Sequence, residues 1–558
     1  MEKKFVIGMD FGTDSVRAIL VDSADGSELA NSVCNYKRWK AGLYSDAAVS
    51  QFRQHPLDYL EAMTEVVKTV VAECGDPSLI KAISIDSTGS TPCLVDENLE
   101  PLSLQEGFED DPDAMFILWK DHTSEEEAAE ITEHCSAHMP DYACHMGNNY
   151  SPECFWAKIL HVLRKSERIR DKVYSAMELC DWIPAVLTGC RKIEDIKASH
   201  CAAGAKQMWA KEWGGFPPES FFSGIDPMLV PILEHLPDNN FSCSVSAGTL
   251  TGRWAEIFGL SEKTEIGVGN IDSHSGAVGG GVSYKNMVMN FGTSACYMAV
   301  VPNDVMRGRI VDGVFGQAEG SILEGMDGFE VGLSAFGDLF AWMKRLLCWP
   351  LENILSSVLD GEIIRNAEDR ILEELTEKAA LLPLRYDAPV ATDYFNGRRV
   401  PHPDGSLTGS LAFLNISSTA PEIFRALVES TAFATKTILD YMSLNGVAID
   451  RLIAIGGVSI KSPFTMQMMS DVLERRLEVS SSRHAGALGA AIHASVIAGI
   501  YDNVTQAQAN MCQPVMRIYE PDLSGKDILN FRYRKYTDMV HFTETERTVR
   551  NQSNILRH

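Results

Sequence analysis

The sequence predicts a mixed α/β protein made of two large, related domains. A chain of 558 residues with 45% hydrophobic content can fill more than one core, because single cores seldom grow beyond about 250–300 residues. A short phrase also occurs twice, as Asp10-Phe11-Gly12-Thr13 and as Asn290-Phe291-Gly292-Thr293. In each half, β-rich runs come first and helical patterns follow, which is typical of α/β folds. Similar copies in the two halves indicate an internal duplication.

Each copy of the phrase predicts a strand, a tight Gly-Thr turn and a returning strand. The apolar runs 5–9 and 287–289 lead directly into the two turns, as strands of a hairpin do. A Gly-Thr turn offers backbone N–H groups and a hydroxyl without a blocking Cβ, which suits a phosphate oxygen. One copy alone is more typical of an ordinary hairpin turn. The duplication favours two phosphate-facing loops that share one cleft.

In the first half, two strand regions are expected on either side of a helix. Residues 5–23 and 81–96 contain apolar and β-branched runs that favour strands. Between them, apolar residues recur at helical spacing from Pro56 to Val71, which predicts an amphipathic helix.

The second half repeats this scheme. Strands are expected within residues 286–301, and helices over 334–347, 421–442 and 463–474. The charged segment 526–546 is expected to form one exposed helix without a motif.

The repeat also sets the domain boundary. No Pro- or Ser-rich linker separates the halves, so the boundary is placed just before residue 285. The prediction is an N-terminal domain over residues 1–284 and a C-terminal domain over residues 285–558.

Composition excludes several classes of partner. The net charge of −27 argues against a general affinity for nucleic acid or an anionic membrane, because both require a basic surface. The apolar run before Asp10 is too short for a signal peptide, and the weakly polar stretch 485–500 is too short to span a bilayer. Thirteen cysteines, an odd number, fit reduced thiols. We expect a cytoplasmic protein; a homodimer is left open.

Metal-capable side chains gather between His134 and His145, including Cys135, His138 and Cys144. No Cys-x-x-Cys pair or other known zinc spacing occurs there. The preceding acidic segment has the composition of a helix start, so the cluster is expected at the far end of that helix or in the next loop, without a structural metal.

A glycine-rich segment lies between the two copies of the phrase. Gly267 to Gly281 contains Asp272 among six glycines, with His274 two positions later. Glycines let the backbone approach a ligand closely and could present the carboxylate rigidly. The equally weighted alternative is an interdomain hinge whose Asp caps a helix.

Together with the two Gly-Thr turns, this segment indicates phosphoryl transfer. That reaction needs oriented donors around the γ-phosphate, a divalent cation and a carboxylate that takes the proton from the incoming hydroxyl. Asp272 is the candidate base. Asp10 is the candidate Mg²⁺ partner, since Mg²⁺ commonly uses one or two carboxylates together with waters and phosphate oxygens.

Two further glycine-containing segments have a structural and a functional interpretation. Leu452 to Ser459 reads as a strand broken by Gly456 and Gly457, and Ala485 to Ala491 reads as a helix start made of small residues. Both fit a nucleotide site, but tight strand–helix packing is the commoner use of such glycines. The chain has neither a Walker loop nor a GxGxxG fingerprint.

Over about residues 5–500 the chain resembles the FGGY carbohydrate kinases, which belong to the actin, Hsp70 and hexokinase superfamily. It is most similar to the bacterial members that phosphorylate L-ribulose. The segments that carry the resemblance are Asp10 to Ala18, Asp86 to Pro92, Leu118 to Thr123, Glu178 to Trp182 and Asp393 to Arg399.

The resemblance implies two ribonuclease-H-like domains that close on ATP and a ketopentose. It assigns Asp272 as the catalytic base, in agreement with the chemical argument. It implies that Lys206, Asp272 and Glu330 bind the sugar. It also implies that the backbone near Cys93 contacts the sugar. The nucleotide-binding residues it implies are Gly12, Thr13, Gly292, Thr293, Gly337, Gly456, Gly457 and Lys461. On composition alone, Lys206 reads as a surface lysine and Glu330 as a helix-start acid.

Cys93 stands where these relatives usually carry Ala, so a tighter sugar pocket is expected. The family in general also has Gly near Phe413 and Asn in place of Lys461; the L-ribulose kinases share the Lys. The expected activity is ATP-dependent phosphorylation of O5 of L-ribulose with Mg²⁺, in L-arabinose catabolism. The alternatives are a kinase for D-ribulose, xylulose or ribitol, a non-sugar ATPase of the superfamily, and a catalytically silent sugar sensor.

Overall fold

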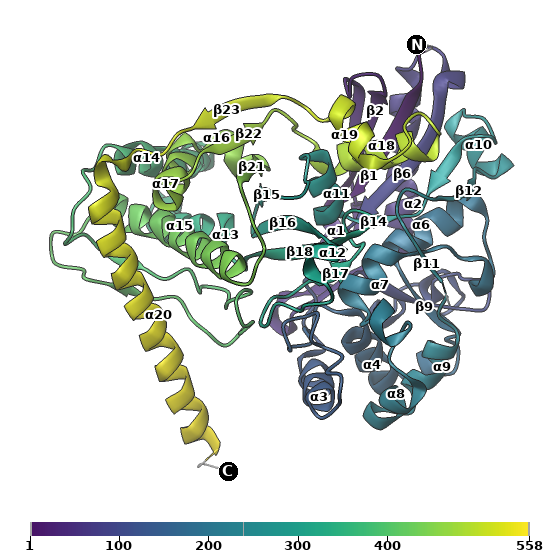
Figure 1. Ribbon diagram of the computed structural model, residues 1–558, viewed down its shortest axis with the longest axis horizontal. Coiled ribbons are helices and arrows are strands. Elements are labelled where there is room, and N and C mark those ends of the chain that lie inside the picture. Colours follow the sequence, from purple (N-terminus) through teal and green to yellow (C-terminus); the bar gives the residue numbers. More distant parts are fainter. Residues whose placement is uncertain (1–2, 238, 556–558) are drawn as a thin grey trace.

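The computed structural model describes residues 3–237 and 239–555, so the predicted domain ends at 1–2 and 556–558 lie outside it. Two large sheets lie side by side with helices around them (Figure 1). The first has the order β12-β13-β6-β1-β2-β3, with β14 also paired to β6. The second has the order β17-β18-β16-β15-β21-β22-β23. The predicted mixed α/β class with two large units is therefore confirmed.

The strands of the first sheet come from residues 5–271, and those of the second from residues 286–519. The first sheet comprises β1 (Phe5–Phe11), β2 (Ser15–Asp22), β3 (Glu28–Asn35), β6 (Ile80–Ser87), β12 (Ser246–Thr249), β13 (Glu265–Gly267) and β14 (Asn270–Ile271). The second comprises β15 (Asn286–Phe291), β16 (Ala295–Pro302), β17 (Gln317–Glu319), β18 (Met326–Leu333), β21 (Arg451–Ile455), β22 (Leu477–Ser480) and β23 (Val515–Tyr519).

The main helices match the helical periodicity of the sequence. Those of the first half are α2 (Pro56–Ala72), α3 (Glu125–Ser136), α4 (Phe155–Lys165), α6 (Leu179–Thr188), α7 (His200–Lys206), α10 (Gly252–Phe258) and α11 (Asp272–Gly279). Those of the second half are α13 (Gly337–Asn353), α14 (Gly361–Ala380), α15 (Ala420–Leu444), α16 (Gly457–Lys461), α17 (Pro463–Leu473), α18 (Ala485–Ile497) and α20 (Lys526–Ile555).

Both predicted Gly-Thr hairpins are present. Strands β1 and β2 pair antiparallel, and the Gly12 N–H donates to the Ser15 carbonyl at 3.0 Å. Strands β15 and β16 pair in the same way, and the Gly292 N–H donates to the Ser294 carbonyl at 3.0 Å. The duplicated phrase therefore corresponds to a duplicated structure.

Strand register brings three acidic positions to one edge of the first sheet. In the parallel pair β1–β6, Asp10 lies opposite Asp86, and β14 places Asn270 opposite Asp86 on the other side. Asp272 follows β14 as the first residue of α11. Parallel strands end at the same edge, which is where open α/β sheets bind ligands.

Helices α11 and α18 cross closely between the two sheets. A Cβ at Gly489 would overlap the Ser275 carbonyl, and one at Gly279 would overlap the Ala485 carbonyl. Their contact continues into a hydrophobic cluster that includes Val288 of the second sheet. The glycines after Ala485 thus serve mainly tight packing, the commoner of their two predicted uses.

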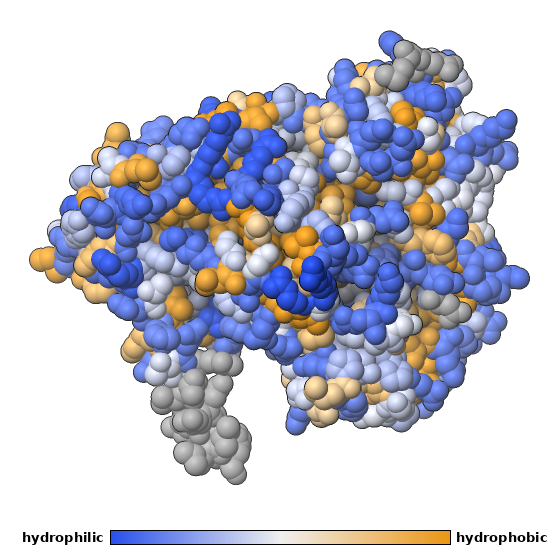
Figure 2. Space-filling view, in the orientation of Figure 1, coloured by the Kyte–Doolittle hydropathy of each residue, from blue (hydrophilic) through white to orange (hydrophobic). Residues whose placement is uncertain are grey.

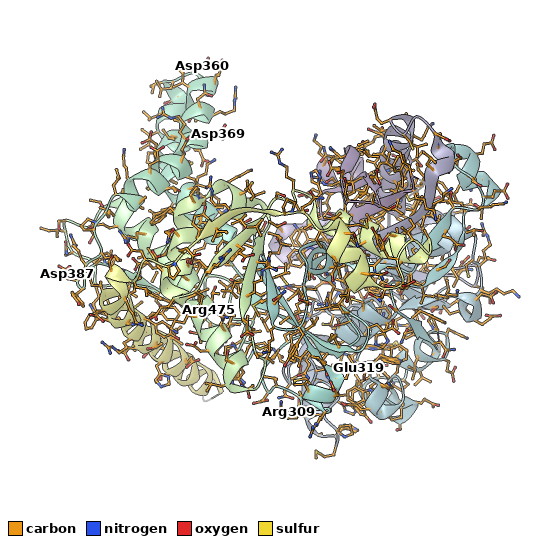
Figure 3. All side chains as sticks on the ribbon, turned by 45° about the horizontal axis from the view of Figure 1, so that its top comes forward. Arg309, Glu319, Asp360, Asp369, Asp387 and Arg475 are labelled. Carbon is orange, nitrogen blue, oxygen red and sulfur yellow. The ribbon has the colours of Figure 1, made fainter. Side chains whose placement is uncertain are left out.

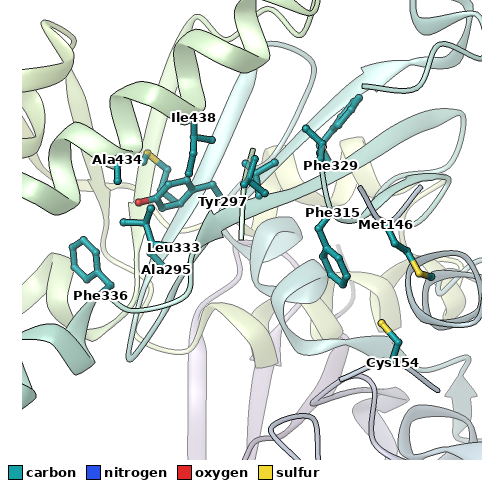
Figure 4. Close-up of a cluster of buried hydrophobic side chains, with 14 of the residues drawn as sticks. Met146, Cys154, Ala295, Tyr297, Phe315, Phe329, Leu333, Phe336, Ala434 and Ile438 are labelled. Atoms are coloured by element: carbon teal, nitrogen blue, oxygen red, sulfur yellow. The ribbon is translucent and has the colours of Figure 1, made fainter. Parts of the chain in front are cut away.

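A second cluster joins the halves on the other side of the second sheet. Met146 and Cys154 belong to the same buried core as Phe315 and Phe329, and Figure 4 shows these side chains close together. Segments from both halves therefore share apolar surface beside the cleft.

The prediction that the C-terminal helix is exposed was wrong for its first turns. Leu529, Arg532 and Tyr536 of α20 are buried. The Arg532 Nε donates to the Glu429 carboxylate of α15 at 2.7 Å, and its guanidinium also donates to the carbonyls of Ala388 and Pro389. A segment rich in charged residues is typical of a solvent-exposed helix. Arg532 is buried because its partner, Glu429, lies 103 residues earlier in the sequence.

Arg532→Met is expected to lower the free energy of unfolding by about 3 kcal/mol. Removing one partner of a buried ion pair usually costs about 3–5 kcal/mol, and the lower end applies because Arg425 still contacts Glu429 at 3.0 Å. Urea unfolding followed by circular dichroism measures this change. A loss below about 1 kcal/mol would contradict a stabilising role for the pair.

The surface is largely polar. Figure 2 shows hydrophilic residues over most of one face, with scattered apolar ones. The hairpin of α13 and α14 projects from the C-terminal half, with Asp360 at its tip (Figure 3). None of the described helices has the length and hydropathy required to cross a membrane.

Candidate active site

A cavity of about 330 Å³ lies between the two sheets. Five of the residues predicted for the site lie on its walls, namely Asp10, Lys206, Asp272, Glu330 and Gly456. They come from both halves of the chain, so the site forms only when the two sheets lie together. The structure thus brings together one predicted metal residue, the predicted base, two predicted sugar residues and one nucleotide residue.

Two acids, Asp10 and Asp272, line this cavity, and the buried Asp86 behind them interacts with the charges of both. Asp86 is fully buried, and both of its oxygens lack a hydrogen-bond partner among the described residues. Gly486 leaves room for this cluster, since a Cβ there would lie 3.1 Å from Asp10 Oδ2 and 3.6 Å from Asp86 Oδ2. Buried acids without donors are costly unless a cation is nearby. Asp10 and Asp86 therefore fit a divalent cation such as Mg²⁺, which prefers carboxylate oxygens.

The electrostatics of the three acids follow from burial and mutual repulsion. Burial raises the pKa of Asp86 well above its ordinary value, and the charges of Asp10 and Asp272 raise it further. Burial also raises the pKa of Asp10. The pKa of Asp272 is raised to about 7 by burial and then by the Asp10 charge. An acid with a pKa near neutrality is suited to accept a proton in general base catalysis.

Lys206 and Glu330 form a buried ion pair across the cavity. Lys206 ends α7 and Glu330 lies in β18, and Lys206 Nζ donates to Glu330 Oε2 at 3.3 Å. Burial alone would lower the pKa of Lys206, but the Glu330 carboxylate raises it above its ordinary value. Burial would raise the pKa of Glu330, but Lys206 lowers it to about 2. Both groups are therefore charged at neutral pH. Lys206 is buried and Glu330 lies in a strand, so the alternatives of a surface lysine and a helix-start acid were wrong.

The second Gly-Thr turn is fixed to the start of α13. The Gly292 carbonyl accepts the Gly337 N–H at 3.1 Å, and the Thr293 carbonyl accepts the N–H groups of Phe336 and Asp338. A Cβ at Gly337 would lie 2.7 Å from the Gly292 oxygen. Gly456 meets the same hairpin with φ +90°, a conformation that favours glycine. These glycines therefore allow the second hairpin, the start of α13 and the end of β21 to pack with their backbones in contact.

The first Gly-Thr turn is held differently. The Thr13 hydroxyl accepts a hydrogen bond from Trp119 Nε1 at 3.0 Å, and the Thr13 carbonyl accepts one from Gln54 Nε2 at 2.6 Å. Gly12 and Thr13 follow Asp10 after one buried residue, Phe11, and remain partly exposed.

The other eight predicted site residues do not line this cavity, namely Gly12, Thr13, Cys93, Gly292, Thr293, Gly337, Gly457 and Lys461. The Cys93 side chain is fully buried in β7 (Pro92–Val95), within the core of the first half. Its extra volume therefore changes core packing and does not narrow the cavity, which corrects the expected tighter pocket. Lys461 ends α16 with an exposed side chain, one turn after Gly457.

Sequence reasoning assigned no role to several residues on the cavity walls. The charged and aromatic ones are Arg17, Trp119, Glu153, Arg399, Arg483 and His484. Arg399 Nη1 lies 3.8 Å from Glu330 Oε1, and His122 Nε2 lies 3.4 Å from Glu153 Oε1. Trp119, Arg399 and also Asp86 lie inside segments that carried the family resemblance, so that signal could have identified them. Nothing in the local sequence indicated Glu153.

In the histidine cluster, His134 packs against helix residues of the N-terminal half. Its Nε2 contacts the Phe221 carbonyl at 3.1 Å, and the ring packs on Phe221. Among the described residues, Cys144 and His145 do approach Glu212 within 4.8 Å. The His145–Glu212 contact of 2.8 Å accounts for this approach.

The larger cavity of the molecule lies elsewhere. It has a volume of about 840 Å³ and lies among α2, α6 and α10, with mostly apolar walls that include Trp182 and Trp254. None of the predicted site residues lines it, whereas five of them line the smaller, more polar cavity.

Comparison with known families agrees with this geometry. Residues 5–279 match the N-terminal domain of the FGGY family of carbohydrate kinases, and residues 287–498 match its C-terminal domain. The chain belongs to the FGGY carbohydrate kinases. The resemblance seen in the sequence is confirmed, and the protein is an ATP-dependent sugar kinase.

Curated FGGY relatives cover nearly the whole chain. A ribulokinase of Vibrio parahaemolyticus serotype O3:K6 is 41% identical over 546 residues, covering 97% of this chain and 96% of the relative. A ribulokinase of Halalkalibacterium halodurans is 32% identical over 555 residues, covering 97% and 95%.

Solved structures of two sugar kinases share the fold at low sequence identity. Xylulose kinase from Rhodospirillum rubrum has a TM-score of 0.78 at 19% identity and covers 97% of this chain and 99% of that one. Gluconate kinase from Lactobacillus acidophilus has a TM-score of 0.77 at 18% identity and covers 96% and 98%. These structures support the FGGY fold.

Proposed function

We propose that this FGGY kinase transfers the γ-phosphoryl group of ATP to O5 of L-ribulose. The single observation that carries the proposal is the cavity whose walls carry Asp10, Asp272 and the Lys206–Glu330 ion pair. Ribulokinases that are 41% and 32% identical over nearly the full chain support ribulose as the sugar. The stereochemistry and the O5 position rest on the resemblance of the sequence blocks.

Asp272 would act as the general base. Its carboxylate would accept the hydroxyl proton as the sugar oxygen attacks the γ-phosphorus, which is the proton transfer this reaction requires. The Ser273 N–H donates to Asp272 Oδ1 at 2.6 Å and holds the carboxylate in place. The second carboxylate oxygen can then turn toward the substrate.

Lys206 and Glu330 would hold the sugar, with the backbone near Cys93 at the same end of the cleft. An ammonium and a carboxylate together can orient hydroxyl groups, which both donate and accept hydrogen bonds. The positive charge of Lys206 also lies on the side where negative charge moves during transfer. The N-terminal domain, over residues 1–284, would thus supply most of the sugar site.

The two Gly-Thr turns would bind the phosphates of ATP. The turn glycines, with Gly337, Gly456, Gly457 and Lys461, would form the nucleotide side, mainly from the C-terminal domain over residues 285–558. Asp10, with Asp86, would hold Mg²⁺, which supplies positive charge to the phosphate oxygens. Closure of the cleft would exclude water and limit wasteful hydrolysis of ATP.

A coupled assay of ADP release tests the substrate. L-Ribulose, D-ribulose, D-xylulose and ribitol should each be offered at saturating MgATP, and we expect the highest kcat/KM for L-ribulose. A higher value for another sugar would move the assignment to that pentulose or pentitol. Release of ADP that no sugar stimulates would contradict the proposed reaction altogether.

The pH profile should have an acidic limb caused by Asp272. Its pKa is raised to about 7, and the carboxylate accepts a proton only when ionised, so kcat/KM should rise with pH and level off above this value. Mg²⁺ beside Asp10 would reduce the repulsion, which places the midpoint at or below about pH 7. Initial rates from pH 5 to 8 measure the limb; a flat profile would contradict the role of Asp272.

A further inference from the structure

Three separate segments that form one wall of the cavity are all tied to helix α4. Thr88, Gly89, Trp119 and Lys206 line this wall, and none of them belongs to α4. Their neighbouring backbone carbonyls, however, accept hydrogen bonds from side chains in or just before α4. The helix therefore lies behind the wall as a common support.

Lys158 makes two of these connections. Its Nζ donates to the Ser90 carbonyl at 2.7 Å and to the Leu118 carbonyl at 2.9 Å, although these residues are far apart in the sequence. The side chain is only 1% exposed. Ser90 follows Gly89 and Leu118 precedes Trp119, so one ammonium group fixes both segments of the wall.

The third segment is held by aromatic donors. The Tyr150 hydroxyl donates to the Lys206 carbonyl at 3.0 Å and accepts the Trp156 N–H at 3.0 Å. The Trp156 indole donates to the Gln207 carbonyl at 2.8 Å. The end of α7 is thereby fixed relative to α4.

Glu178 secures the loop beside Lys158 from the opposite side. Its carboxylate accepts hydrogen bonds from the Ser90 hydroxyl and from the Thr91 N–H, the latter at 2.7 Å. Glu178 itself is 1% exposed. The loop from Thr88 to Thr91 is thus held between a buried cation and a buried anion.

We propose that Lys158 is a positioning residue of the kinase, which sets the sugar-facing wall of the cleft by joining the Ser90 and Leu118 backbones. Lys158 does not line the cavity and acts through Gly89 and Trp119. The inference rests on the proposed sugar side of the cleft. A displacement of a binding wall by about 1 Å can reduce turnover strongly, so loss of this support affects sugar use before it affects ATP binding.

The charge of the Lys158 ammonium group should make the KM for sugar depend on pH. Burial lowers its pKa to about 8, against the opposing effects of the acids Asp121, Glu178 and Glu153 and the Cys154 thiol. His122 also faces the group. Charge-assisted hydrogen bonds are stronger than neutral ones, so the KM for sugar should rise as the pH increases through about 8. The KM for ATP should not follow this change.

Lys158→Met tests the proposal, since methionine retains most of the volume but has no donor. We expect the KM for L-ribulose, or for the panel sugar with the highest kcat/KM, to rise at least about tenfold. The KM for ATP should stay within about twofold, and the alkaline rise in sugar KM should disappear. Lys158→Arg should recover part of the effect, because arginine keeps the charge and donors.

Two further variants separate positioning from general stability. Arg532→Met removes a buried cation remote from the cleft and should leave both KM values unchanged. Glu178→Gln provides a second measurement if Lys158→Met fails to fold, with the same expected rise in sugar KM. An unchanged sugar KM and an unchanged alkaline limb in Lys158→Met would overturn the role of Lys158 while leaving the substrate assignment intact. A rise confined to the KM for ATP would overturn the placement of the sugar, and the proposal with it.

Discussion

Asp272→Asn is expected to lower kcat by about 10²–10⁴-fold, the usual effect of losing a general base. Asparagine has nearly the same shape and can still accept the Ser273 N–H at the oxygen position, so the start of α11 should keep its conformation. Asparagine cannot, however, take the proton of the attacking hydroxyl. The fold and the affinity for ATP should therefore be retained while transfer is lost.

The measurement combines initial rates, thermal unfolding and calorimetric titration with ATP. Asp181→Asn is a matched control, because burial also raises the pKa of Asp181 to about 7 but this residue does not line the cavity. Its Oδ1 accepts the Ser199 N–H at 2.7 Å, a bond that asparagine can also form. Near-normal turnover of Asp272→Asn, or an equal loss in both variants, would remove Asp272 from the mechanism.

Asp86→Asn is expected to weaken the apparent affinity for Mg²⁺ by about 10–100-fold, the range seen when groups that support a metal are changed. Asp86 has no hydrogen-bond partner for either oxygen among the described residues. A bound cation would compensate the negative charge of the Asp86 carboxylate. The neutral amide of asparagine would not attract a cation. Both the Mg²⁺ dependence of the rate and the rise of the unfolding temperature with Mg²⁺ should shift to higher concentration.

The same variant should alter how stability depends on pH in the absence of Mg²⁺. The folded-state pKa of Asp86 is raised well above its ordinary value, so the native state holds a proton that the unfolded chain releases. Wild-type stability should thus fall as the pH rises from about 4 toward the folded-state pKa. The stability of Asp86→Asn should not show the decrease that Asp86 causes. The unfolding temperature of this variant relative to the wild type should therefore rise as the pH increases.

Melting curves between pH 4 and 8 with a chelator measure this difference. Glu478→Gln serves as a control, because Glu478 is a mostly buried acid that pairs with Arg451 at 2.6 Å, and its loss should destabilise the protein. A constant offset for Asp86→Asn across pH, or an unchanged response to Mg²⁺, would contradict the cation site.

Much of the fold follows from local patterns. The Gly-Thr turns, α2 and α15 were all predictable, because each depends on periodicity or turn chemistry within a few residues. The burial of Arg532 was not, because its partner Glu429 lies on another helix. Charge composition cannot show which charges meet.

The residues of the candidate site also fall into two groups, those indicated by the nearby sequence and those that depend on contacts between distant segments. Asp272 and Asp10 could be proposed from the sequence because each stands beside glycines or a phosphate-type turn, although for Asp272 a helix cap was an equally weighted alternative. Lys206 and Glu330 came only from family resemblance, since their ion pair spans 124 residues. Cys93 was assigned to the sugar through its segment, yet its side chain points into the core. Sequence position does not show which side of a strand faces the ligand.

The sequence by itself determined the duplicated hairpins, the α/β class and the acid between the repeats, since these depend on residues close together in the chain. The tertiary structure decided the rest of the chemistry. The register of β1, β6 and β14 places Asp86 beside Asp10, and burial then raises their pKa values. The crossing of α11 with α18 brings the second sheet against the first. Low dielectric and proximity in space create the site, and neither is a property of any short segment.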